Sequence, residues 1–145
     1  MVESKTEKLA MAVANHMEKG DKFSSMLGMK LVSAEAGEAV VSLEITELLV
    51  NGHGICHGGV MFSLADTTFA YACNSRNHKT VALNCSISFL APVKVGQILR
   101  ATATEKSLKG RTGVYDIAVC DEAGETVALF RGTSYRMKDF VIETD

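Results

Sequence analysis

One segment of the sequence limits the possible folds more than any other. Written as a helix, residues 60–73 (VMFSLADTTFAYAC) are apolar around almost the whole circumference. Met61, Leu64 and Ala72 recur at helical spacing on one side, and Phe62 and Phe69 lie on the other. A helix that lacks a polar face is buried by the rest of its domain. The chain must therefore enclose this helix within a layer of other structure.

The segments around the helix are typical of strands. Residues 30–45 predict two strands separated by a turn around Gly37, and residues 81–89 alternate apolar and polar side chains with a period of two. Three more strands are predicted at 97–106, 113–120 and 126–136, and another helix at 5–19. We therefore predict an α+β fold in which an antiparallel sheet wraps around one central helix.

Length and charge narrow the class of protein. A chain of 145 residues suits one domain, and a net charge of −2 without a basic block argues against nucleic acid as a partner. No apolar run approaches the length of a membrane span, and the first residues lack the apolar core of a signal peptide. We expect a cytoplasmic protein that binds no membrane. It divides into an N-terminal helical segment (1–22), a main domain (23–138) and a C-terminal tail (139–145).

Asp66 is the most informative residue of the central helix. Its neighbours one turn away are Phe62, Ser63, Phe69 and Ala70, and none of them is basic. A carboxylate without a partner on an apolar face is costly, so the position indicates either chemistry or a partner from elsewhere in the fold. Such a partner is a cation or a hydroxyl group.

The glycine-rich segment before the helix, residues 51–59 (NGHGICHGG), is the second candidate feature and is called the glycine loop below. The first N–H groups of a helix lack internal partners, and glycine lets a substrate approach them, so Gly58 fits an oxyanion hole. A plain turn before a helix is the alternative. Asn51 can orient water or a carbonyl, and His57 can act as a base, as a donor to the substrate, or only as a residue that starts the helix. The spacing of His53 and His57 is weak support for a metal, and we expect no metal site.

Two further features carry weaker signals. The four cysteines have no CxxC spacing, and we interpret them as buried thiols. Cys56, beside His57, is a possible nucleophile. The basic turn at residues 109–112 (KGRT) is either a solvated hairpin tip or a clamp for phosphate groups, which arginine binds with two hydrogen bonds.

The segment HGGVMFSLAD at residues 57–66 resembles the HGG(x)nD signature of hot-dog thioesterases of the PaaI type. Residues 70–75 (AYACNS), 84–92 (NCSISFLAP), 112–117 (TGVYDI) and 128–132 (ALFRG) are also similar to this family. The resemblance covers roughly residues 25 to 137. It implies that residues 23–138 form a hot-dog thioesterase domain, and it covers the N-terminal helix least.

The resemblance also implies the roles of individual residues. The catalytic positions are Asp66, Gly58, Asn51 and His57. The coenzyme A-binding positions are Leu90, Lys94, Lys109, Gly110, Arg111 and Thr112, and Phe62, Phe69 and Ala82 are expected to line the acyl pocket. Ala82 is a departure, because some relatives carry a serine there that helps to position water. No cofactor is implied. Relatives build each site across a dimer and often pair dimers into tetramers, so we expect a homodimer or homotetramer.

The expected function is hydrolysis of acyl-CoA thioesters to free acid and coenzyme A, with phenylacetyl-CoA or hydroxylated phenylacetyl-CoA as the substrate. Two alternatives remain open. A hot-dog dehydratase or hydratase acting on enoyl- or hydroxyacyl-CoA uses a histidine and a carboxylate, which His57 and Asp66 could supply. A non-catalytic protein that binds acyl-CoA is the other, since a fold alone does not fix a function.

Overall fold

A computed structural model describes residues 3–144 of the chain. It contains three α-helices, one short 3-10 helix and six strands. In chain order they are α1 (Lys5–Gly20), α2 (Lys22–Leu27), β1 (Lys30–Glu35), β2 (Glu38–Glu44), η1 (Glu47–Leu49), α3 (Gly58–Cys73), β3 (His78–Phe89), β4 (Ile98–Lys109), β5 (Thr112–Cys120) and β6 (Thr126–Phe140).

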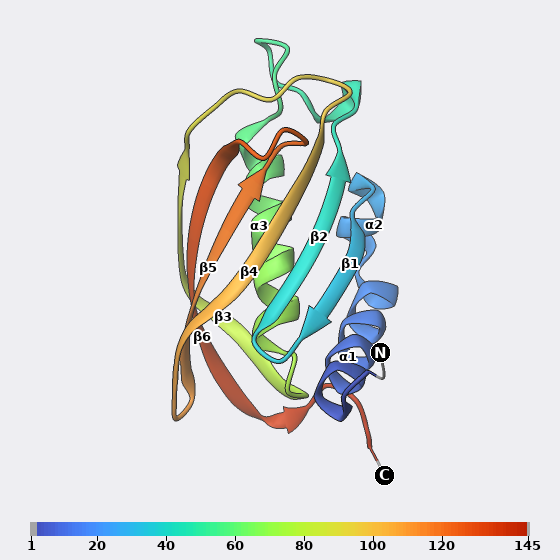
Figure 1. The fold of residues 1–145 in the computed structure, drawn as a ribbon, viewed down its shortest axis with the longest axis vertical. Coiled ribbons are helices and arrows are strands. Elements are labelled where there is room, and N and C mark those ends of the chain that lie inside the picture. Colours follow the sequence, from blue (N-terminus) through green and yellow to red (C-terminus); the bar gives the residue numbers. More distant parts are fainter. Residues whose placement is uncertain (1–2, 145) are drawn as a thin grey trace.

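The six strands form one antiparallel sheet in the order β1-β2-β4-β5-β6-β3. The sheet curves around α3, which lies along its inner face, while α1 and α2 lie beside β1 (Figure 1). The predicted architecture, an antiparallel sheet wrapped around one central helix, is confirmed. None of the helices in residues 3–144 is long and apolar enough to cross a membrane.

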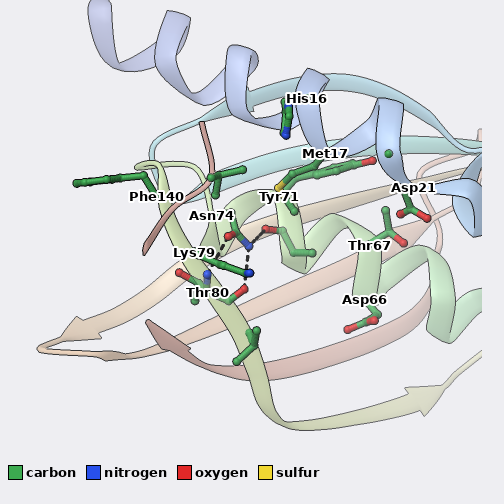
Figure 2. Close-up of a pocket in the computed structure, with 14 residues that line it drawn as sticks. His16, Met17, Asp21, Asp66, Thr67, Tyr71, Asn74, Lys79, Thr80 and Phe140 are labelled. Carbon is green, nitrogen blue, oxygen red and sulfur yellow. Dashed lines mark hydrogen bonds between the residues drawn. The ribbon is translucent and has the colours of Figure 1, made fainter. Parts of the chain in front are cut away.

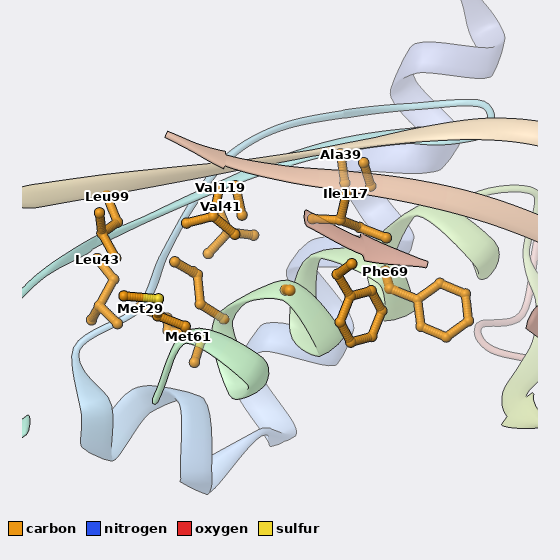
Figure 3. Close-up of a cluster of buried hydrophobic side chains, with 14 of the residues drawn as sticks. Met29, Ala39, Val41, Leu43, Met61, Phe69, Leu99, Ile117 and Val119 are labelled. Atoms are coloured by element: carbon orange, nitrogen blue, oxygen red, sulfur yellow. The ribbon is translucent and has the colours of Figure 1, made fainter. Parts of the chain in front are cut away.

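The core fills the space between α3 and the inner face of the sheet (Figure 3). Met61 and Phe69 of α3 pack against strand residues such as Val41 and Ile117, all of them buried. Each large apolar side chain contributes roughly 1.5–3 kcal/mol by leaving water. Gly132 of β6 is required here, because a Cβ at this position would lie 2.7 Å from the Phe69 ring. The central helix and the sheet therefore fit each other closely.

The N-terminal segment is more structured than the sequence indicated. Ala10, Val13 and Ala14 of α1 are buried, and the short helix α2, which we did not predict, follows directly. Asp21 caps α2 by accepting a hydrogen bond from the Ser24 backbone N–H at 3.0 Å. The boundary expected after residue 22 therefore falls inside α2.

The C-terminal end also differs from the expectation. Strand β6 continues to Phe140, past the predicted end at Arg136 and past the boundary at residue 138. Beyond the strand, the backbone N–H groups of Val141 and Ile142 donate to Asn77, at 3.2 and 2.9 Å. Much of the expected tail therefore extends the sheet and packs beside the end of β3.

Strand β3 is only partly covered by the rest of the chain. Its alternating pattern predicted a strand correctly, and Cys85 and Ile87 are half-buried against the core. Three other apolar side chains are exposed: Val81 is 44% exposed, Leu83 61% and Phe89 54%. Strand β3 is also an edge of the sheet, so one side of its backbone has no strand partner. On α3, Phe62, Ser63, Asp66, Ala70 and Cys73 share a half-buried stripe, called the open stripe below.

Candidate active site

Asp66 lies in the middle of α3 on the open stripe and lines a cavity of about 550 Å³, called the Asp66 cavity below (Figure 2). Within residues 3–144 its carboxylate has neither a hydrogen bond nor an ion pair. Lys79 lines the same cavity but forms no ion pair with it. The structural alternatives considered for this residue, a cation or a hydroxyl group from elsewhere in the chain, are therefore not observed among the described residues.

The surroundings of Asp66 increase its affinity for a proton. Burial raises the pKa of the Asp66 carboxyl above its ordinary value of 3.8, and the Asp21 carboxylate in the same cavity raises it further. Asp21 is held in place, because it accepts a hydrogen bond from Ser24 Oγ at 2.6 Å, and Ser24 Oγ lies 3.1 Å from Thr67 Oγ1 on α3. A carboxylate whose pKa is raised is a stronger base.

The start of α3 leaves one backbone donor free. The N–H of Gly59 donates to His57 Nδ1 at 2.8 Å, and the N–H groups of Val60 and Met61 donate to the His57 carbonyl at 2.9 and 3.3 Å. The Gly58 N–H has no partner among the described residues. It lies at the positive end of the helix dipole, where a substrate oxygen is stabilised. The geometry thus gives Gly58 the donor that an oxyanion hole needs.

His57 has a structural task in this arrangement. Because its Nδ1 accepts the Gly59 hydrogen bond, the proton of a neutral imidazole lies on Nε2. His57 is thus the N-cap of α3 and offers Nε2–H as a donor. A role as base at Nδ1 conflicts with the cap.

Asn51 closes the glycine loop and keeps one polar group free. Its Oδ1 accepts hydrogen bonds from the backbone N–H groups of His53 at 2.9 Å and Ile55 at 3.4 Å. Its Nδ2 makes no hydrogen bond within residues 3–144. Asn51 lines a second cavity of about 370 Å³ together with Gly58 and Leu90, called the Gly58 cavity below.

The two central candidates do not meet within one chain. Asp66 is absent from the lining of the Gly58 cavity, and Gly58 from that of the Asp66 cavity. Eight residues of α-helix separate them by about 12 Å along the axis. That distance is too long for both groups of one chain to contact the same carbonyl group.

The residues expected to bind coenzyme A also fall into two groups. Leu90 lies in the Gly58 cavity, and Lys94 pairs with Ile55 beside the glycine loop. The turn at 109–112 joins β4 to β5 at the opposite end of the molecule (Figure 1). Gly110 has a φ of +60° there, which suits the two-residue hairpin loop, and Arg111 Nη1 donates to the Arg136 carbonyl at 3.1 Å.

The residues expected in the acyl pocket lie in three different surroundings. Phe62 is half-buried against Phe130, with ring centroids 5.2 Å apart, and Ala82 is exposed on β3. Phe69 is 1% exposed and packs against Phe130 and Tyr115, so the structure places it in the core and not at a cavity.

The Asp66 cavity is lined largely by residues that the sequence did not point to, among them Met17 and Asp21 of the N-terminal segment, Tyr71 of α3 and Phe140 of β6. Tyr71 follows Asp66 by five positions, which places it about 140° around the helix from Asp66, so helical spacing gave no signal that both residues line one cavity. The others come from segments that only the tertiary fold brings to α3.

Cys56 is not suited to act as a nucleophile. It is 4% exposed, and burial raises the pKa of its thiol to about 11, which keeps it protonated at neutral pH. All four cysteines are free thiols. The described residues contain no group of three or more histidines, cysteines, aspartates or glutamates placed to hold a metal ion.

Asp66→Asn is expected to raise the melting temperature at neutral pH. Because folding raises the pKa of Asp66, the protonated carboxyl favours the folded state. That contribution is complete below about pH 3.8 and is lost as the pH rises through the folded pKa. The gain from the neutral amide should therefore be present at pH 7 and shrink toward zero at low pH. The exposed Asp139→Asn is the control, and a lower melting temperature for Asp66→Asn at pH 7 would contradict this picture.

Comparisons with known proteins identify the family. The family model "Thioesterase superfamily" matches residues 53–128, which include the glycine loop from His53 onward and all of α3. The acyl-coenzyme A thioesterase PaaI of Escherichia coli K12 is 47% identical over 124 residues, covering 86% of this chain and 89% of that protein.

Solved structures are similar as well. The structure of the E. coli PaaI protein from the phenylacetic acid degradation operon superposes with a TM-score of 0.92 at 43% identity, covering 94% of this chain and 99% of that one. The Streptococcus mutans protein smu.793 bound to acetyl CoA gives a TM-score of 0.75 at 26% identity, covering 78% of this chain and 91% of that one. The chain therefore belongs to the thioesterase superfamily, with the hot-dog fold, and is an acyl-CoA thioesterase of the PaaI type.

Proposed function

We propose that the chain hydrolyses phenylacetyl-CoA or ring-hydroxylated phenylacetyl-CoA, at sites that two chains build together. The observation that carries this proposal is that, among residues 3–144, the Asp66 carboxylate in one cavity and the Gly58 N–H in another have no partner. The E. coli relative encoded in a phenylacetic acid degradation operon supports the choice of acyl group.

The chemistry follows from what each group offers. A thioester carbonyl bound between the two half-sites accepts a hydrogen bond from the Gly58 N–H of the partner subunit, which stabilises the negative charge that develops on its oxygen. Asp66 takes a proton from a water molecule as that water attacks the carbonyl carbon. The C–S bond then breaks, the acid remains, and the sulfur of coenzyme A leaves with the proton returned from Asp66. Asn51 Nδ2 and His57 Nε2–H are further donors beside the carbonyl.

Two surfaces support assembly into a dimer. The outer edge of β3 has no strand partner, and an open edge pairs readily with a second chain. Val81 and Leu83 on this strand are exposed apolar residues, and the open stripe of α3 is half covered. A second chain related by a two-fold axis beside β3 would cover both surfaces. It would also bring Asp66 toward the glycine loop of the partner subunit. Two such dimers can assemble further into a tetramer.

We also assign roles in the dimer to the residues expected to bind coenzyme A and the acyl group. We assign Leu90 and Lys94 beside the glycine loop, and Lys109, Gly110, Arg111 and Thr112 at the hairpin, to coenzyme A. A guanidinium group binds phosphate with two parallel hydrogen bonds, which suits Arg111. Phe62 and Ala82 border the region that a partner would cover, and we assign them to the acyl pocket. The four free thiols fit the reducing cytoplasm, where we place the enzyme.

Asp66→Asn is expected to lower kcat by about 100- to 10,000-fold with the fold intact, because the amide cannot accept the proton of water. The measurement is release of free thiol from phenylacetyl-CoA, with Asp139→Asn as a matched control that keeps its activity. A variant that retains near wild-type kcat would show that Asp66 is not the base.

Arg111→Ala is expected to raise KM for coenzyme A thioesters roughly five- to tenfold, because a charge-assisted hydrogen bond to phosphate is lost. Thioesters of N-acetylcysteamine lack the nucleotide and should be hydrolysed as by the wild type. Arg100→Ala, which removes an exposed arginine from β4 away from the hairpin, is the control. An equal rise in KM for both kinds of substrate would show that Arg111 does not bind the phosphates of coenzyme A.

A further inference from the structure

The Asp66 cavity extends past the carboxylate into the space between α3 and the C-terminal end of α1 (Figure 2). Its apolar lining includes Met17, Ala70 and Val81. At about 550 Å³ it has the size of a small-molecule pocket. An acyl group whose thioester lies at Asp66 would extend into this space.

Several polar groups on the cavity wall are already used by the fold. Asn74 Nδ2 donates to the carbonyls of Ala70 at 2.9 Å and Thr80 at 3.0 Å, and its Oδ1 accepts from the Thr80 N–H at 2.9 Å. The hydroxyl of Thr67 shares a hydrogen bond with Ser24. These groups hold α2, α3 and β3 together and have little capacity left for a ligand.

Three other polar side chains line the cavity, and each is either exposed to water or already hydrogen-bonded within the chain. His16 and Lys79 are exposed, so water solvates them at the rim of the cavity. The Asp21 carboxylate accepts hydrogen bonds from the backbone N–H and the hydroxyl of Ser24. None of these three is a buried group in need of a partner.

Tyr71 differs from all of them. Its side chain lies beneath α1 and lines the cavity, the residue is only 2% exposed, and its hydroxyl makes no hydrogen bond within residues 3–144 (Figure 2). A hydroxyl that lines a cavity and has no partner among the described residues is free to bind water or a polar group of a ligand that fills the cavity.

The charges around this hydroxyl indicate what kind of partner fits. Burial raises the pKa of Tyr71, and the carboxylates of Glu18 and Asp21 raise it further, so the group stays protonated at neutral pH. Acidic neighbours disfavour an anionic substituent. A neutral hydroxyl group, which both donates and accepts, matches Tyr71 best.

We propose that Tyr71 is a specificity-determining residue that recognises a hydroxyl group on the aromatic ring of the acyl group. This inference rests on the proposed hydrolysis of arylacetyl-CoA and adds the residue that binds the hydroxyl substituent of the ring. Asp66 and Tyr71 both line the Asp66 cavity and lie about 7.5 Å apart along the helix axis. A thioester at Asp66 and the far side of its ring at Tyr71 can therefore lie in one cavity.

The test compares phenylacetyl-CoA with meta- and para-hydroxyphenylacetyl-CoA, substrates that differ by one oxygen atom. The wild type should show a higher kcat/KM for at least one hydroxylated substrate. Tyr71→Phe keeps the ring and should reduce that preference about three- to tenfold, with kcat/KM for phenylacetyl-CoA nearly unchanged. Tyr135→Phe removes a hydroxyl from β6 outside the cavity and should leave the preference as it is.

Different outcomes would overturn the role of Tyr71 and the proposed hydrolysis of arylacetyl-CoA. If the wild type hydrolyses these thioesters without a preference for a hydroxyl group, or if Tyr71→Phe keeps the full preference, the role of Tyr71 is overturned. A loss in Tyr71→Phe that is equal for all substrates would show that the hydroxyl acts only through the structure, and also overturns it. If the wild type releases no thiol from any of them, the proposed function itself fails.

Discussion

The structure depends on how the sheet encloses α3 while leaving one stripe of it uncovered. Phe69 and Met61 anchor the helix against the inner face of the sheet, and Gly132 lets the Phe69 ring approach the backbone of β6. The uncovered stripe carries Asp66, a carboxylate without a partner in the described chain. The enclosure that stabilises the fold therefore also half-buries the Asp66 carboxyl, which raises its pKa, and places it in a cavity that α1 and β3 help to line.

The fold was largely predictable because its signals are local. A helix that is apolar on every side and strands that alternate with a period of two both follow from which face must leave water. The elements that local sequence patterns did not predict depend on tertiary contacts. Helix α2 has six residues and is held by the Asp21 cap and the Ser24–Thr67 hydrogen bond, and the last residues of β6 are fixed by Asn77. The alternation in β3 predicted the strand but could not show that three of its apolar side chains stay exposed in a single chain.

The site was predictable in part. The position of Asp66 and the donor at Gly58 follow from one helix and its N-terminus, which the sequence places directly. The role of His57 required the structure, because only the hydrogen bond from Gly59 shows that Nδ1 is engaged. Phe69 was expected in the acyl pocket from the resemblance, yet it is buried and faces the sheet. Tyr71 and the N-terminal segment were missed because the cavity they line forms only when α1 packs across α3.

The central claim is that each site combines Asp66 of one chain with Gly58 of another, and mixing two inactive variants tests it most directly. Gly58→Pro removes an N–H that has no partner in the described chain and adds a ring beside Phe89, and His57, with φ −61° and ψ 134°, already has the extended conformation that precedes proline. Gly58→Ala, which keeps the N–H, is the matched control for the added Cβ. Mixed in equal amounts with Asp66→Asn chains, Gly58→Pro chains should restore about a quarter of wild-type activity, because half of the dimers are mixed and each has one intact site of two. No recovery, with mixed dimers shown to form and fold, would contradict the account.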